Sequence, residues 1–117
     1  MIHSEENLQI ACVEWFSLSH PRLAVLLHHS PNGGYRNVRE AVKFKKMGTR
    51  AGFPDLILCL PNAKYHGACF ELKSPKGVLS DKQKEWGAKV VEHDYYYAVV
   101  YNVEQFIEEI KNYLSLT

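Results

Sequence analysis

Two stretches of the chain decide its fold: GFPDLILCL at residues 52–60 and YHGACFELK at residues 65–73. The run Leu56-Ile57-Leu58 is apolar without interruption, as in a strand that is buried on both faces. Pro61-Asn62-Ala63, between the stretches, is a turn signal. We therefore predict strands over 53–60 and 65–73 that pair as a hairpin.

The predicted hairpin brings two carboxylates together. Residues two apart in a strand share a face, so Glu71 and Lys73 point the same way while Leu72 points into the core. Asp55 starts the neighbouring strand, where it can meet Glu71 at one ion. Magnesium needs only one or two carboxylates, and the main-chain carbonyl of Leu72 is a further candidate ligand. The alternative is a surface ion pair between Glu71 and Lys73, worth about 0–1 kcal/mol.

Lys73 would lie beside the attacking water or the phosphate of such a site. A lysine is charged at neutral pH, so the side chain would stabilise negative charge and position the water. It could act as a general base only if its pKa were strongly lowered.

Outward from the hairpin, the pattern predicts a mixed α/β fold with helices on both sides of a central sheet. Ser4 is a candidate N-cap of the first helix, and Asn102 of the last. The predicted helices span 4–18, 80–92 and a closing segment after Asn102, and the further predicted strands span 23–28 and 95–101. The stretch 36–47 is an additional candidate helix, and 30–34, 48–52 and 74–79 are predicted turns or loops.

Length and composition indicate one ordinary globular domain over residues 1–117. No apolar run approaches the ~20 residues that cross a bilayer, and the N-terminus lacks the features of a signal peptide. The cysteines are odd in number and widely spaced, and each has apolar neighbours, so we expect three buried, reduced thiols: Cys12, Cys59 and Cys69. We expect a cytoplasmic protein.

Charge is uneven although the net charge is only +1. Residues 36–50 carry net +5, with Glu40 as the one acid, and the basic side chains are Arg36, Arg39, Lys43, Lys45, Lys46 and Arg50. Such a stripe suits a polyanion, and a solvated basic face is the alternative. The histidines show no spacing typical of zinc ligands.

The segments 48–58 and 70–83 together resemble the VRR-NUC family, within the PD-(D/E)XK nuclease superfamily. The resemblance includes the turn 30–34 and the acidic first helix, so it covers most of the chain. One departure is Phe53 before the Pro-Asp pair, where a smaller residue is frequent. The resemblance implies a restriction-endonuclease-like core, Mg²⁺ with Mn²⁺ as a substitute, and endonucleolytic cleavage of DNA. Small members resemble Holliday-junction resolvases, tend to be homodimers and are often phage-encoded.

The resemblance also assigns site residues. Asp55 is the aspartate of the Pro-Asp element, and Glu71 and Lys73 form the Glu-X-Lys pair. Gln83 matches a glutamine of the site, although it also completes a capping box with Ser80. A first-helix glutamate completes the metal site. Glu5 fits better than Glu6, because it lies on the apolar stripe, although it can simply complement the helix dipole.

The candidate DNA contacts follow from the turn, the basic stripe and the family pattern. Backbone amides of the turn can bind a phosphate, and an ordinary turn is the alternative. The candidates are Ser30, Asn32, Gly33, Arg36, Arg39, Lys43, Thr49, Arg50 and Lys76. Two other functions fit the same residues: a non-catalytic reader of DNA structure and an RNA-directed nuclease. The number of metal ions and the preferred DNA structure stay open.

Overall fold

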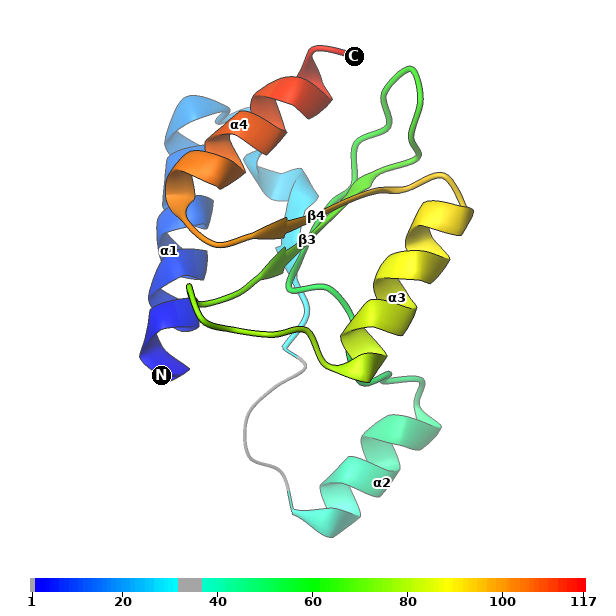
Figure 1. Cartoon of the computed structure of the whole chain (residues 1–117). Helices are drawn as coiled ribbons and strands as arrows, with labels where there is room; N and C mark the ends of the chain where they lie inside the picture. The colour runs from blue at the N-terminus through cyan, green and yellow to red at the C-terminus, as the bar shows by residue number, and fades with distance from the viewer. Residues whose placement is uncertain (1, 32–36) are drawn as a thin grey trace.

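The computed structural model describes residues 2–31 and 37–117, and Figure 1 shows the path of the chain. The helices are α1 (Ile2–Ser19), the 3₁₀ turn η1 (Ala24–Leu26), α2 (Val38–Lys46), α3 (Asp81–Glu92) and α4 (Val103–Leu114). The strands are β1 (Leu27–His29), β2 (Leu56–Leu58), β3 (Ala68–Leu72) and β4 (Tyr96–Val100). Three candidate DNA-binding residues, Asn32, Gly33 and Arg36, lie outside the described residues.

The four strands form one mixed sheet in the order β1-β2-β3-β4. The predicted hairpin is confirmed, because β2 pairs antiparallel with β3 and Leu56 lies opposite Phe70. β1 pairs antiparallel with β2, whereas β4 runs parallel to β3, with Glu71 opposite Val99. The connection from β3 to β4 therefore crosses over through α3, as parallel neighbours require.

Helices cover both faces of the sheet. α1 and α4 pack together on one face, and α3 packs against β4 on the other (Figure 1). The core lies under α1 and α4, where alternate residues of the strands meet the apolar sides of the two helices. Its fully buried members include Phe16, Leu56, Phe70, Leu72, Val100, Phe106, Ile110 and Tyr113. The predicted α/β fold with flanking helices is confirmed.

Three local predictions were wrong. The segment predicted as a strand over 23–28 begins as the turn η1, because the amide of Leu26 bonds to the carbonyl of Leu23; only Leu27–His29 is extended. Ser4 is not the N-cap of α1, since the helix already begins at Ile2. Cys59 is exposed, because β2 ends at Leu58 and the next residue no longer faces the core.

α2 confirms the candidate helix in the basic stretch. Asn37 caps it, with its side chain accepting the amide of Glu40 at 2.8 Å. The helix has no buried residue and stands below the body of the molecule in Figure 1. Among the described residues, no helix is long and apolar enough to cross a bilayer.

Candidate active site

The sheet register brings Asp55 and Glu71 together, as the sequence predicted. Asp55 immediately precedes β2, and its Oδ2 accepts a hydrogen bond from the amide of Leu72 at 2.8 Å. Leu72 is buried in the core, so its neighbours in β3 point to the other face of the sheet. Glu71, on that face, is only 1% exposed, and the Asp55 carboxyl lies near enough to raise its pKa. The carboxyl groups of Asp55 and Glu71 therefore form a close pair.

The surroundings of Glu71 make its ionised form costly. Its Oε2 accepts a hydrogen bond from Gln83 Nε2 at 3.0 Å, while Oε1 is buried without a described hydrogen-bond donor. Burial is the main cause that raises the pKa of Glu71 to about 9, and the nearby carboxyl group of Asp55 adds to it. Lys73 lowers this pKa and Glu5 raises it. Without a cation beside it, the Glu71 carboxyl therefore favours its protonated form at neutral pH.

A divalent cation fits this pair. Within the described part of the chain, Oε1 of Glu71 lacks a hydrogen-bond partner, and the neighbouring Asp55 carboxylate is itself an acceptor. An ion between the two would supply the missing partner and favour the charged form of Glu71. Two carboxylates are enough for Mg²⁺, which completes its shell with water and substrate oxygens.

The other two proposed ligands lie at the edge of the same pair. Glu5 and Leu72 line a cavity of about 480 Å³ together with Asp55. The carboxylate of Glu5, however, accepts a hydrogen bond from the amide of Ser74 at 3.2 Å. Among the described residues, no three acidic, histidine or cysteine side chains converge on one point. Asp55 and Glu71 are thus the centre of the arrangement, with Glu5 beside it.

Gln83 holds both of the roles that the sequence left as alternatives. Its side-chain Oε1 accepts a hydrogen bond from the backbone amide of Ser80 at 2.9 Å, and its backbone amide donates to Ser80 Oγ at 3.2 Å. Together the two bonds form a complete capping box. The other end of the same side chain, Nε2, bonds to Glu71. The cap therefore aims the amide of Gln83 at the carboxyl pair.

Gly52 allows the segment before Asp55 to pack closely on the start of α3. Its φ is +85°, and a Cβ atom there would lie 2.5 Å from the carbonyl carbon of Lys82. Only glycine allows this backbone conformation and this close approach together. The backbone three residues before Asp55 therefore packs on the residue that precedes Gln83. The contact fixes the two halves of the site relative to one another.

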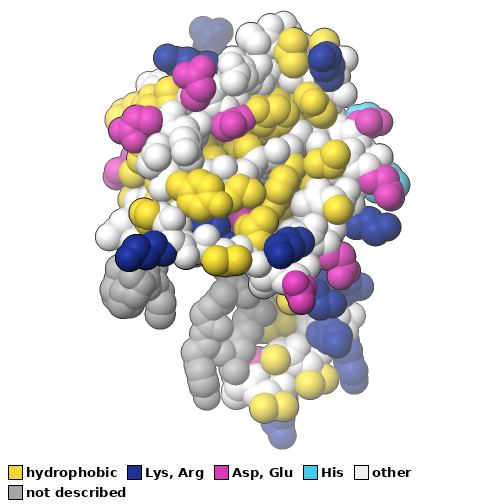
Figure 2. Space-filling model, in the orientation of Figure 1, with side chains coloured by type: hydrophobic (Ala, Val, Ile, Leu, Met, Phe, Trp, Pro, Cys, Tyr) yellow, Lys and Arg dark blue, Asp and Glu magenta, His cyan; other side chains and the backbone are white. Residues whose placement is uncertain are grey.

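The described candidate DNA contacts come from α2, from the segments on either side of it and from the loop after β3. Arg39 and Lys43 lie exposed on α2, and Lys76 lies exposed in the loop after β3. Ser30, Thr49 and Arg50 line a cavity of about 440 Å³ between α2 and the body of the molecule. Figure 2 shows Lys and Arg side chains gathered along one side of the lobe that α2 forms.

Two residues near the pair were missed at the sequence level. His29 Nδ1 lies 2.9 Å from the carbonyl oxygen of Asp55, to which it donates, and the side chain lines the cavity with Glu5. Tyr97 carries a buried hydroxyl without a described partner, and burial, followed by the charge of Glu71, raises its pKa to about 12. The alternation of β4 relative to β3 could have indicated Tyr97, but nothing in the sequence marked His29.

Comparison with known proteins agrees with this geometry. The family profile of the VRR-NUC domain matches residues 1–104. The chain belongs to the VRR-NUC family. This VRR-NUC domain is also similar to a solved structure described as a VRR_NUC domain protein, with a TM-score of 0.84 and 30% sequence identity. The match covers 97% of this chain and 89% of that one. A comparison with curated proteins found no match.

The comparisons confirm the family resemblance seen in the sequence. VRR-NUC domains are a nuclease family, and the four-stranded sheet between helices is consistent with a restriction-endonuclease-like fold. The matched residues include the segments that carry the carboxyl pair, Lys73 and Gln83 of this VRR-NUC domain.

Proposed function

We propose that this VRR-NUC domain is an endonuclease that hydrolyses DNA phosphodiester bonds with Mg²⁺, for which Mn²⁺ can substitute. One observation carries the proposal: Glu71 places a buried oxygen without a hydrogen-bond donor beside the carboxyl group of Asp55. An acid–acid contact of this kind weakens the fold of the free protein, because one group must hold a proton. A function for the pair explains why the chain has it, and a divalent ion needs such oxygens.

Each site residue has a distinct proposed role. Asp55, Glu71 and the carbonyl of Leu72 would hold the ion, and Glu5 would join them by releasing the amide of Ser74. A bound ion of this kind polarises the scissile phosphate and lowers the pKa of a coordinated water. Lys73 stabilises the negative charge on the phosphate and positions the water.

Gln83 acts on this chemistry in the proposal by orienting a ligand. Its Nε2 holds Oε2 of Glu71 at 3.0 Å, so Oε1 would be the oxygen that holds the ion. Because the capping box with Ser80 fixes the glutamine side chain, Glu71 is presented in one orientation. A preorganised ligand loses less entropy when the ion and the substrate bind.

The decisive experiment compares DNA cleavage by the wild type, Asp55→Asn and Glu71→Gln in Mg²⁺, in Mn²⁺ and in EDTA. We expect cleavage by the wild type in either metal, none in EDTA, and loss of cleavage in both variants with DNA binding retained. The matched control is Glu108→Gln, the same chemical change at an exposed position of α4. Cleavage by Asp55→Asn and Glu71→Gln at the rate of the wild type would refute the assignment.

The same experiment tests the other functions. Binding without cleavage by the wild type in any metal would favour a reader of DNA structure, and cleavage of RNA alone would favour an RNA-directed nuclease. An endonuclease must also cut a closed circular substrate, which has no end for an exonuclease to use. A carboxyl pair facing a polyanion would weaken simple binding, which argues against the reader of DNA structure. The same ion chemistry would serve an RNA backbone.

The preferred substrate in this proposal is branched DNA, such as a flap or a four-way junction. A panel of single-stranded, nicked, flapped and junction DNA with Mg²⁺ or Mn²⁺ tests this, and equal cleavage of an intact duplex would contradict it. The proposal includes a homodimer of the resolvase-like, phage-encoded type, and a monomer mass in light scattering at micromolar concentration would remove that part. A cytoplasmic location is proposed from the cysteines, which are free rather than paired in disulfides.

A further inference from the structure

A third cavity lies between α2 and α3, and it shares Thr49 and Arg50 with the cavity of about 440 Å³. It has a volume of about 530 Å³, within the range of roughly 300–1,000 Å³ that is typical of small-molecule sites. Two aromatic side chains, Phe44 and Trp86, line it from opposite helices. Its lining also carries four cations against the single acid Glu85, namely Lys45, Arg50, Lys82 and Lys89. The cavity thus combines aromatic surface with net positive charge.

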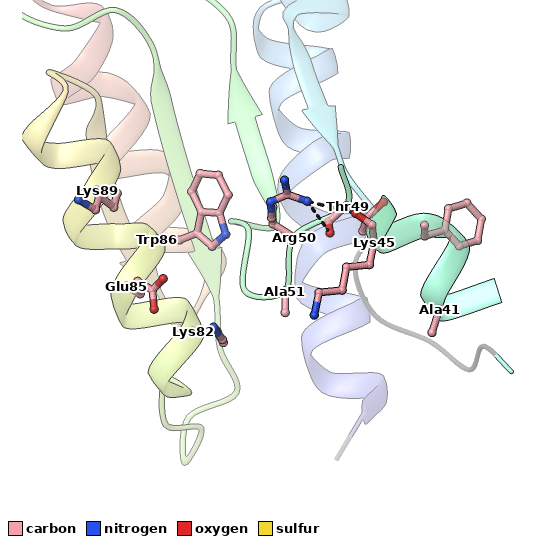
Figure 3. A pocket seen from close by; sticks show the side chains of 10 residues that line it. Ala41, Lys45, Thr49, Arg50, Ala51, Lys82, Glu85, Trp86 and Lys89 are labelled. Atoms are coloured by element: carbon pink, nitrogen blue, oxygen red, sulfur yellow. Dashed lines mark hydrogen bonds between the residues drawn. The ribbon is translucent and has the colours of Figure 1, made fainter. Parts of the chain in front are cut away.

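The aromatic part of the cavity is held in place by the fold. Trp86 is half-buried and projects from α3 toward the segment 49–51 in Figure 3. Its ring meets the ring of Phe53 edge to face, with 4.9 Å between the centroids. This contact supports the indole, so that ordering it on binding costs little entropy.

The cationic part is anchored at the end of α2. Nη1 of Arg50 lies 3.3 Å from the carbonyl oxygen of Lys45 and 3.4 Å from that of Thr49, and it donates to both (Figure 3). Lys45 extends from α2, and Lys82 belongs to the first turn of α3. Lys89, by contrast, forms an exposed salt bridge with Glu92, with 3.6 Å between Nζ and Oε2. Arg50, Lys45 and Lys82 are therefore the main positive charges of the cavity.

Two pairs of consecutive residues, Ala51-Gly52 and Lys82-Gln83, connect the cavity to the carboxyl pair. Ala51 and Lys82 line the cavity, and the residues that follow them are Gly52 and Gln83. Gly52 packs on the backbone of Lys82, and Gln83 bonds to Glu71. Gly52 and Gln83 thus join the lining of the cavity to the segments that carry the carboxyl pair.

We propose that this cavity binds an unpaired nucleotide of the nucleic acid that the carboxyl pair cuts, with its base on Trp86 and Phe44 and its phosphate near Lys45 and Lys82. Aromatic rings beside Lys and Arg side chains are the combination that holds single-stranded nucleic acid, because every base can stack and every phosphate is negative. A paired base is covered by its neighbours on both faces, so the cavity selects unpaired strands. The inference deepens the proposed function and rests on it for the identity of the polymer.

Trp86 reports on its own site. The chain has two tryptophans, so Trp15→Phe leaves Trp86 as the only one. Trp15 packs against Phe16 and Phe106 in the core, where phenylalanine keeps the aromatic contacts. We expect that titration of this variant with oligo-dT in EDTA quenches the fluorescence of Trp86, with a blunt duplex of equal length quenching it less. Oligo-rU is a parallel arm that distinguishes DNA from RNA. No quenching by either single strand, or equal quenching by the duplex, would overturn the proposal.

Affinity measurements give an independent test with matched controls. Base–aromatic stacking predicts roughly 5- to 150-fold weaker binding of the single strand by Trp86→Leu, with most of the loss recovered in Trp86→Phe. Lys45→Gln with Lys82→Gln should weaken binding, whereas Lys64→Gln with Lys111→Gln, the same charge change outside the cavity, should leave it nearly unchanged. Equal effects of the two lysine pairs, or no effect of Trp86→Leu, would contradict the assignment.

The outcome for this cavity can be separated from the outcome for the carboxyl pair. If single-stranded oligonucleotide quenches Trp86 but the protein cuts no substrate, the nucleotide site is supported and the nuclease proposal is rejected. Metal-dependent cleavage without any response of Trp86 would do the reverse.

Discussion

Replacing Glu71 with glutamine should make the metal-free protein more stable while it abolishes cleavage. Glutamine has nearly the shape of a protonated glutamate and carries no charge to bury. Its amide nitrogen can donate to Asp55, and its oxygen can accept from Gln83 Nε2, which now bonds to Glu71 Oε2. The variant keeps the donor and acceptor pattern of the neutral acid, so the buried contacts should survive.

The size of the gain follows from the pKa of Glu71, which rises from its ordinary 4.5 to about 9 on folding. Between these values the folded chain holds a proton that the unfolded chain has released, so the free energy of unfolding falls as the pH rises. About 2.5 pH units separate the ordinary pKa from pH 7, and one unit corresponds to about 1.4 kcal/mol. Glu71 therefore lowers the free energy of unfolding at pH 7 by about 3 kcal/mol, which the glutamine variant should regain.

Urea denaturation in EDTA at pH 5, 6, 7 and 8 measures this gain. The difference in free energy of unfolding between Glu71→Gln and the wild type should be small at pH 5 and should increase toward pH 8. Glu108→Gln, at an exposed position, should follow the wild type at every pH. A Glu71→Gln protein that is less stable than the wild type at pH 7, or a difference that does not change with pH, would refute the reasoning.

Three further predictions concern the framework and the basic stripe. Gly52→Ala should lower the free energy of unfolding by about 2–4 kcal/mol, through backbone strain and overlap with Lys82. Gly48→Ala, at φ +106° with nothing within 4 Å of the added Cβ, should lower it by only about 1–2 kcal/mol. Equal losses in urea denaturation would contradict the packing argument. Gln83→Ala and Gln105→Ala should each lose helix-capping bonds worth about 1 kcal/mol of stability. Only Gln83→Ala should slow cleavage, because Gln105 lies at the start of α4 without touching the site. Equal cleavage rates of the two variants would show that Gln83 acts only as a cap. Arg39→Gln with Lys43→Gln should reduce the salt slope of DNA binding by about 2, and an unchanged slope would return both side chains to a solvated face.

Local periodicity was sufficient for much of the fold and for part of the candidate site. The turn 61–63 predicted the hairpin, and alternation along the strand put Glu71 and Leu72 on opposite faces, as observed. Asp55 could be predicted to lie near Glu71, because a turn between two strands fixes which of their residues lie opposite one another. The length of a strand was harder to predict, since β2 stops at Leu58 although the apolar run continues to Leu60.

Contacts between distant segments could not be predicted in this way. The spacing of the histidines gave no reason to single out His29, yet its ring reaches the carbonyl of Asp55 from β1 to the start of β2. The ring contact of Phe53 with Trp86 and the close approach of Gly52 to Lys82 depend on how α3 returns to the sheet. No local pattern encodes that approach. Cys59 and Cys69 have similar neighbours in the sequence, and only the end of β2 makes the first exposed.

Binding of Mn²⁺ to the protein without DNA tests the central claim most directly, because it requires no choice of substrate. Electron paramagnetic resonance detects free Mn²⁺, so a bound ion appears as loss of signal. We predict loss of signal with the wild type, recovery of the free-ion signal with Asp55→Asn and with Glu71→Gln, and wild-type behaviour of Glu108→Gln. Binding by both site variants as tight as that of the wild type would show that Asp55 and Glu71 are not the metal ligands.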